Sequence, residues 1–160
     1  MNVLSTNLLL AIVWAALAGE FSFSTLLTGF VVGFGALWVV QPLTGATTYH
    51  ARVFAWLRLL VMFLYELVVS SIAVAWDVLT PRHRARPAII DIPLDVKSDA
   101  GILLVTNLIS LTPGSLSLDV SDDRRTLRVH MMFADDPDAL RDAIKSGMEK
   151  WVIDAVEGPQ

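Results

Sequence analysis

The stretch that decides the fold is residues 4–40, LSTNLLLAIVWAALAGEFSFSTLLTGFVVGFGALWVV, in which Glu20 is the one charged side chain. It contains two apolar runs, residues 4–19 and 24–40, joined by residues 20–23. Both runs are near the lower limit of the roughly 17–25 residues with which a helix spans a bilayer. Neither has a polar face, which disfavours a helix pair in a soluble core. The short connection predicts an antiparallel helical hairpin in the membrane.

Charge is distributed very unevenly along the chain. Residues 1–80 hold five of the 28 charged side chains, and the other 23 follow them. A charged residue at the middle of a bilayer costs roughly 2.5–3.5 kcal/mol on insertion scales. We therefore predict a helical membrane region at 1–80, a basic linker at 81–87 and a cytoplasmic domain at 88–160. The hydrophobic content of 54% and the mean hydropathy of +0.59 agree with a membrane protein.

The composition argues against several classes of function. A net charge of −4 provides no overall basic surface for nucleic acid. The chain has no cysteine, so it has no disulfide, thiolate or cysteine-ligated metal chemistry. The three histidines, His50, His83 and His130, lack metal-ligand spacing, and no P-loop or dinucleotide motif is present. We predict a protein without a catalytic site, cofactor or metal site of its own.

The second apolar run carries small residues at helical spacing. Thr25, Gly29 and Gly33 lie four residues apart. Such a stripe forms a flat surface along which another helix backbone can approach closely. We predict that the hairpin packs through this stripe, and that its partners are neighbouring subunits.

A third apolar stretch, residues 53–79, is interrupted by polar side chains. Arg52, Glu66, Ser70 and Asp77 fall near one line of a helical wheel. A spanning helix could bury this line against partner subunits, whereas a helix lying in the interface could keep it in water. Hydropathy favours the first arrangement, while the charges and the length favour the second, so both stay open.

Glu66 is a candidate for an ion or proton path. A carboxylate at membrane depth pairs with a cation, takes up a proton or lines a wet route. The alternative is a carboxylate in contact with lipid headgroups or with an adjoining subunit.

Three arginines, Arg82, Arg84 and Arg86, directly follow the third stretch. Positive residues next to a membrane segment mark the cytoplasmic side. Everything after residue 87 is therefore expected in the cytoplasm. The N-terminus is then outside if the third stretch spans the membrane, and inside if that stretch lies flat.

The last 73 residues have the pattern of an α+β domain. We predict a strand, a helix, two strands and a helix, at residues 88–94, 101–109, 115–120, 126–131 and 138–156. Pro93 suits an edge strand, and Ser98 with Asp99 can cap the first helix. The order β-α-β-β-α is that of a split βαβ unit without a final strand. Its core is thin, so we expect it to lean on the membrane or on a partner.

The junction between the first helix and the second strand of this domain resembles a known family. Residues 107–120, NLISLTPGSLSLDV, followed by LRVH at 127–130, are similar to a signature of the E subunit of Mrp-type (Mnh/Pha) monovalent cation/proton antiporters. Ser115 stands where that family usually has threonine. LTGFVVG at 27–33 and the third apolar stretch with Glu66 extend the resemblance over nearly the whole chain.

The resemblance implies an accessory subunit of a multisubunit complex in the plasma membrane that exchanges Na⁺ for H⁺. In such complexes the large subunits are taken to carry the proton path, and the E subunit helps to assemble the membrane region. The implied partners are the other subunits and the bilayer, with Na⁺ and H⁺ moved by the complex as a whole. Thr112-Pro113-Gly114 would then be a sharp helix-to-strand turn, with glycine at positive φ.

Two other functions are weighed against this one. The first is a free-standing membrane-anchored module whose cytoplasmic domain recruits a soluble partner. The second, an independent channel, is disfavoured because so few polar residues could face a pore.

Overall fold

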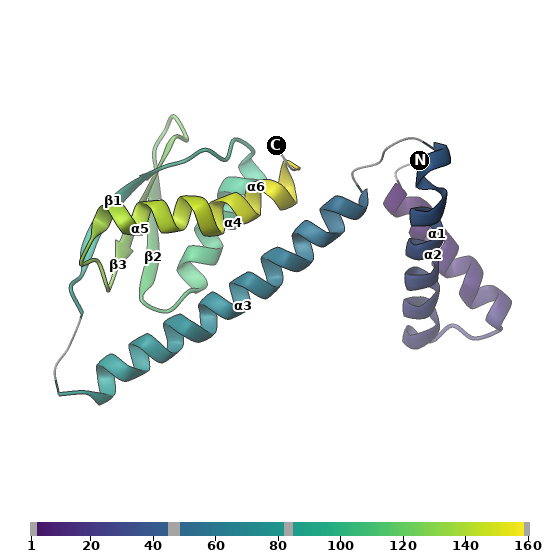
Figure 1. Cartoon of the computed structure of the whole chain (residues 1–160), viewed down its shortest axis with the longest axis horizontal. Coiled ribbons are helices and arrows are strands. Elements are labelled where there is room, and N and C mark those ends of the chain that lie inside the picture. Colours follow the sequence, from purple (N-terminus) through teal and green to yellow (C-terminus); the bar gives the residue numbers. More distant parts are fainter. Residues whose placement is uncertain (1–2, 45–48, 82–84, 159–160) are drawn as a thin grey trace. The chain divides into compact units, whose positions relative to one another are not determined.

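The computed structural model describes residues 3–44, 49–81 and 85–158. Figure 1 labels the helices and strands, which in chain order are α1 Val3–Ala18, α2 Phe23–Thr44, α3 Tyr49–Leu79, β1 Ala88–Pro93, α4 Asp99–Leu111, β2 Ser115–Val120, β3 Thr126–Met131, α5 Pro137–Ile144 and α6 Lys150–Val156. A short π-helical turn, η1 Lys145–Glu149, which we call the π-turn, joins α5 to α6. The bounds of β2 and β3 are those predicted from the alternating sequence pattern.

α1 and α2 pack against each other as the predicted hairpin. Gly19, at φ 74°, follows α1, and Ser22 precedes α2. The Ser22 hydroxyl accepts the backbone N–H of Thr25 at 3.2 Å and shares a hydrogen bond with the Thr25 hydroxyl at 2.8 Å. Ser22 therefore acts as the N-terminal cap of α2. Thr25, the first residue of the small-residue stripe, takes part in this cap.

Within the described residues, two helices are long and apolar enough to cross a membrane by length and composition, namely α2 over Phe23–Val40 and α3. α1 has 16 residues, so it rises about 24 Å, which is less than the roughly 30 Å of a hydrocarbon core. Large apolar side chains such as Leu17 and Val39 are exposed on the hairpin. This surface therefore requires lipid or protein to cover it.

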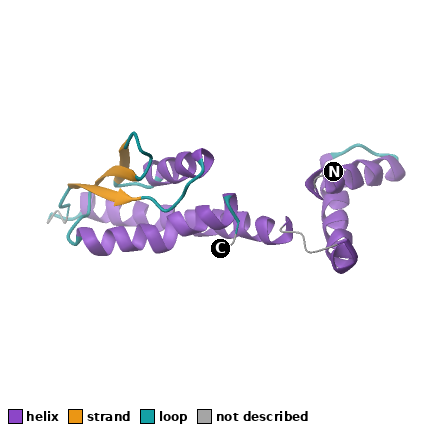
Figure 2. Cartoon of the chain, turned by 90° about the horizontal axis from the view of Figure 1, so that it is seen from above, coloured by secondary structure: helices purple, strands orange, loops and turns teal. Residues whose placement is uncertain are grey.

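The three strands of the C-terminal part form one antiparallel sheet in the order β1-β3-β2 (Figure 2). β1 is an edge strand, as Pro93 suggested. β1 and β2 run parallel on either side of β3, which is the split βαβ arrangement. The core lies on one face of the sheet and includes Ile90, Ile92, Val105, Leu127, Val129 and Val152.

Local signals explain where α4 begins and ends. Ser98 is the N-cap, and its hydroxyl accepts the N–H of Gly101 at 3.2 Å. After Thr112 the chain reverses into β2, with Gly114 at φ 88°, in the left-handed region that favours glycine. The Ser115 hydroxyl donates to the carbonyl oxygens of Ile109 at 2.6 Å and Thr112 at 2.9 Å. These bonds hold the end of α4 against the start of β2.

The C-terminal helix differs from the prediction in one respect. A single regular helix was expected at 138–156, but α5 and α6 are joined through the π-turn η1. A π-turn inserts an extra residue into a helix. Here it lies where two adjacent side chains, Met148 and Glu149, are both buried.

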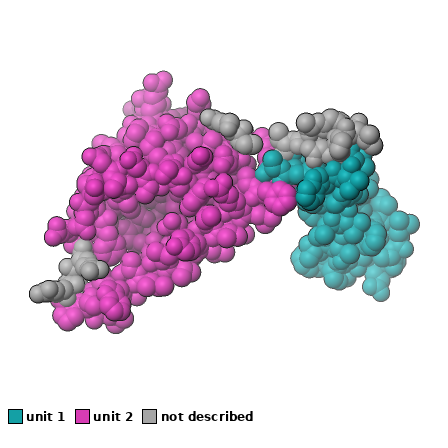
Figure 3. Space-filling view, viewed as in Figure 1, with its two compact units in different colours: residues 1–51 teal, residues 52–160 magenta. Residues whose placement is uncertain are grey.

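The chain divides into two compact units, residues 1–51 and 52–160 (Figure 3). Most of α3 thus belongs with the α+β domain, whereas the predicted division placed it in the membrane region. Leu59 of α3 is 4% exposed and belongs to the core of the domain, with Ala55 and Phe63 packed against it. The thin core of the domain therefore leans on α3 of the same chain.

Candidate functional site

The interface between α1 and α2 depends on Gly29 and Gly33. A Cβ atom on Gly29 would lie 2.7 Å from the Trp14 Cβ and 3.0 Å from the backbone of Ala11. A Cβ atom on Gly33 would lie 2.3 Å from the Asn7 Oδ1. Both glycines therefore face α1 of the same chain. The prediction that the stripe packs against neighbouring subunits is corrected, because this surface is already occupied within the hairpin.

Polar groups are buried beside this interface. Asn7 is fully buried, and its Nδ2 donates to the Tyr49 hydroxyl at 3.0 Å. His50 is 6% exposed, its Nε2 lies 3.3 Å from the Phe34 carbonyl oxygen, and its ring stacks edge-on with Phe34. Asn7, the one amide in α1, was not among the residues predicted from the sequence. These contacts attach the first turn of α3 to the hairpin.

α3 has two different faces. Its line of polar residues, with Glu66, Ser70 and Asp77, is on the side of the helix that carries Leu59 and meets the α+β domain. The opposite side carries large, exposed apolar residues, including Leu57, Leu60, Val61, Leu64, Val68 and Ile72. A helix with one apolar and one polar side is typical of a membrane surface.

Glu66 lies at a cavity between α3 and the α+β domain. The cavity has a volume of about 190 Å³, and Ser70 of α3 and Trp151 of α6 also line it. Most of its other lining side chains are apolar. The structure therefore places Glu66 against the chain's own domain.

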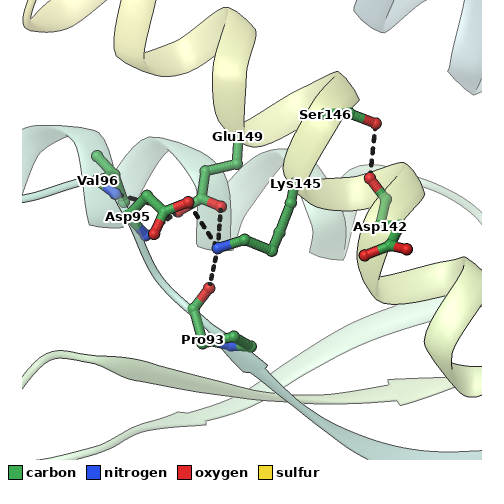
Figure 4. A network of polar contacts seen from close by, with 7 residues as sticks. All are labelled: Pro93, Asp95, Val96, Asp142, Lys145, Ser146 and Glu149. Carbon is green, nitrogen blue, oxygen red and sulfur yellow. Dashed lines mark hydrogen bonds and ion pairs between the residues drawn. The ribbon is translucent and has the colours of Figure 1, made fainter.

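The C-terminal helix holds the segment after β1 through a series of side chains (Figure 4). Lys145 donates to the Pro93 carbonyl at 2.7 Å. The Glu149 Oε1 accepts the N–H groups of Asp95 at 2.6 Å and Val96 at 3.1 Å. Glu149 is 1% exposed, and its Oε2 lies 3.6 Å from the Lys145 ammonium. The loop between β1 and α4 is thus bound by one buried carboxylate and one lysine.

The same series continues at both ends of the helix. Arg141 donates to the Asp91 carbonyl at 2.9 Å. The Glu157 Oε1 accepts the N–H groups of Lys97 and Ser98, both at 2.8 Å. At the opposite edge of the sheet, the N–H of Ser117 in β2 donates to the Ser110 hydroxyl of α4 at 3.1 Å. Side chains of the helices therefore form hydrogen bonds with backbone groups of both edge strands.

These contacts raise the pKa of Lys145 and lower the pKa of Glu157. Burial acts to lower the pKa of Lys145, but the hydrogen bond to Asp95 and the nearby Glu149 outweigh it, so this pKa is raised above 10.5. The backbone N–H of Ser98 lowers the pKa of Glu157 below its ordinary value of 4.5, against a smaller opposing effect of burial. Both shifts favour the charged forms that make the contacts.

We expect a specific acid sensitivity from Glu157. Because its pKa is lower in the folded state, its stabilising contribution is complete above pH 4.5 and is lost as the pH falls through the folded pKa. The variant Glu157→Gln should therefore be less stable than the parent at pH 6, with a difference that shrinks towards pH 3. Thermal unfolding of the full chain at a series of pH values measures this. A constant difference across the series would contradict it.

The remaining predicted residues are placed as follows. Arg82 and Arg84, which carry most of the orientation signal, lie outside the described residues. Arg86 pairs with Asp135 at 3.3 Å and its N–H donates to the Met132 carbonyl at 2.9 Å. Among residues 3–44, 49–81 and 85–158, no group of three or more acidic or histidine side chains is arranged to hold a metal ion.

Comparison with proteins of known sequence gives a consistent result. A family model described as a Na⁺/H⁺ ion antiporter subunit matches residues 7–155. The E1 subunit of the Na⁺/H⁺ antiporter of Staphylococcus haemolyticus is 33% identical over 94% of this chain and 95% of that relative. The E subunit of the Na⁺/H⁺ antiporter of Alkalihalophilus pseudofirmus is 30% identical over 94% of this chain and 96% of the relative.

Two solved structures are similar as well. A chain of the Mrp complex from a Dietzia species matches with a TM-score of 0.50 and 26% identity, covering 64% of this chain and 94% of that one. A chain of the archaeal membrane-bound sulfane sulfur reductase matches with a TM-score of 0.58 over 96% of this chain and 97% of its own length; at 24% identity this shows a shared fold. The resemblance seen in the sequence is confirmed, and the chain belongs to the family of Na⁺/H⁺ antiporter E subunits.

Proposed function

We propose that this chain is an accessory subunit of a multisubunit Na⁺/H⁺ antiporter in the plasma membrane and that it helps to assemble the membrane part of the complex. The observation that carries this proposal is the match to an antiporter E1 subunit over 94% of the chain. The exposed apolar surfaces of α1 and α2 support it, because they need lipid or other subunits to cover them. The transport of Na⁺ and H⁺ belongs to the complex as a whole.

The molecular composition of the purified protein tests this function. Gently solubilised from its own membrane through an affinity tag, the chain should appear in native mass spectrometry within a large hetero-oligomer. A monomer or a homodimer would instead support the stand-alone anchored module.

We further propose that α1 and α2 cross the membrane as a hairpin, with the bilayer thinned locally around the 16-residue α1, and that α3 lies along the cytoplasmic surface. The support comes from the side of α3 that faces the α+β domain, from Leu59 in the core to Val74 beside Gly114. This distance is about 22 Å at 1.5 Å per residue. A helix with a water-soluble domain against one side over such a length is not surrounded by hydrocarbon on that side, whereas its exposed apolar side can face the membrane. Both ends of the chain are then cytoplasmic.

Cysteine labelling tests this topology, because the chain has no cysteine of its own. Phe21→Cys lies between α1 and α2, and Asp122→Cys lies between β2 and β3. In intact cells, a membrane-impermeant maleimide should label the first and reach the second only after permeabilisation. Protection of the cysteine at 21 would contradict the topology and favour three crossings.

A further inference from the structure

The cavity beside Glu66 offers hydrogen-bond acceptors and no basic side chain. Glu66 is half-buried and makes no hydrogen bond or ion pair within the described part of the chain. Thr112 and Ser115 also line the cavity. Their hydroxyl hydrogens are already donated to carbonyl oxygens, that of Thr112 to Leu108 at 2.8 Å and that of Ser115 to Ile109 at 2.6 Å. Each oxygen therefore keeps lone pairs with which to accept a hydrogen bond.

The walls of the cavity favour a cation with an apolar body. Apolar side chains, among them Met131, Leu140, Ile144 and Trp151, form most of the lining. An apolar cavity of about 150 Å³ is large enough for benzene, so 190 Å³ accommodates a short hydrocarbon chain. A lysine side chain combines four methylene groups with an ammonium that has three donors and no acceptor. Its stem matches the apolar walls, and its head matches the acceptors.

A phospholipid headgroup fits this site less well. The ammonium of an aminophospholipid is joined to a phosphate through two carbon atoms. None of the residues that line the cavity is a lysine, an arginine or a histidine. The phosphate would therefore lie near the Glu66 carboxylate with no positive group to balance it.

We propose that this cavity is a docking site for a lysine side chain of a neighbouring subunit, with Glu66 as the carboxylate that pairs with it. The inference rests on the proposed function, since it requires the chain to be part of a hetero-oligomer. It makes Glu66 a contact between subunits on the cytoplasmic side of α3.

Zero-length cross-linking tests the pairing directly. The carbodiimide EDC joins a carboxylate to an amine that is in contact with it, and mass spectrometry of the digested complex identifies the two residues. We expect a cross-link between Glu66 and a lysine of another subunit, absent from the Glu66→Gln variant. Lys145 and Asp95, whose charged atoms are 2.7 Å apart, supply an internal positive control. An intact complex in which this control forms but Glu66 is not joined to a lysine overturns the inference.

The other outcomes are equally decisive. Coupling of Glu66 to the amine of a membrane lipid overturns the inference in favour of a lipid site. A chain that purifies without other subunits overturns both the lysine docking site and the proposed function. An intact complex without the Glu66 cross-link overturns the docking site alone.

Co-purification gives a second measurement. Glu66→Gln should reduce the fraction of chain retained in the complex by about tenfold, because it removes one partner of an interfacial charge pair, whereas Glu20→Gln, at an exposed acid in the hairpin loop, should leave it unchanged. Glu66→Asp keeps the charge and should recover part of the retention. Full retention of Glu66→Gln with reduced Na⁺/H⁺ exchange in vesicles would overturn the docking role and favour an ion path.

Discussion

Adding a single methyl group to Gly29 or Gly33 is expected to disrupt the hairpin. The Cβ of Gly29→Ala would lie 3.0 Å from backbone atoms of Ala11, which cannot move without shifting α1. Overpacking of this kind costs about 1–3 kcal/mol or more. Hydrogen exchange of the α1 amides in nanodiscs should be faster in both variants, and less of each variant should co-purify with the complex.

Gly35 provides the matched control. It lies on the same helix, but a Cβ there would meet no atom within 4 Å. Because alanine is about 1 kcal/mol better than glycine in a helix interior, Gly35→Ala should be neutral or stabilising. Equal effects at positions 29, 33 and 35 would show that close packing is not the cause.

A second substitution should rescue one of these variants. The predicted clash of Gly33→Ala is with the side chain of Asn7, whose Oδ1 would be 2.3 Å away. Asn7→Ala removes that atom but leaves the Leu10 Cβ at 3.2 Å, so the double variant should recover part of the exchange protection of α1. The same substitution should not rescue Gly29→Ala, whose contacts are Trp14 and Ala11.

Replacing Glu149 by leucine should destabilise the α+β domain by about 1–3 kcal/mol or more, the usual cost of leaving buried donors without their acceptor. The N–H groups of Asp95 and Val96 would lose their acceptor, and Lys145 would lose a counter-ion. Because Glu149 is 1% exposed, water cannot easily reach these N–H groups to replace the lost acceptor. This is a large share of the roughly 5–15 kcal/mol by which most domains are stable.

Hydrogen exchange of the Val105 and Val129 amides in the full chain measures this loss, because both residues are in the core of the domain. Glu149→Gln keeps an oxygen acceptor and should lose less than Glu149→Leu. Asp142→Ala, on the same helix but exposed, should stay within about 0.5 kcal/mol of the parent. A Glu149→Leu variant as stable as Asp142→Ala would refute the role given to this carboxylate.

The elements of this fold were predictable where one local signal dominated. Alternation located β2 and β3, and the Ser98 cap located the start of α4. Their partners in space were less predictable. A stripe of small residues indicates close packing but not with which helix, so Gly29 and Gly33 were assigned to neighbouring subunits although they face α1.

Buried polar residues were the hardest to recognise. In the sequence, Glu149 looks like an ordinary acid on a helix, because its burial depends on the π-turn and on amide groups more than 50 residues away. The polar line of α3 was visible as a pattern. The pattern did not reveal what this line contacts, because partner subunits and water were the two environments considered for it. In the structure it faces the α+β domain of the same chain.

The occupied backbone groups of the two edge strands have a consequence for the protein before its complex is built. An open strand edge invites pairing with a strand of another molecule, and so aggregation. Here Arg141 and Lys145 bind the Asp91 and Pro93 carbonyls of β1, proline lacks an N–H, and Ser110 binds the N–H of Ser117 in β2. In a newly made copy that has not yet assembled, these contacts therefore disfavour pairing of the sheet edges with strands of other chains.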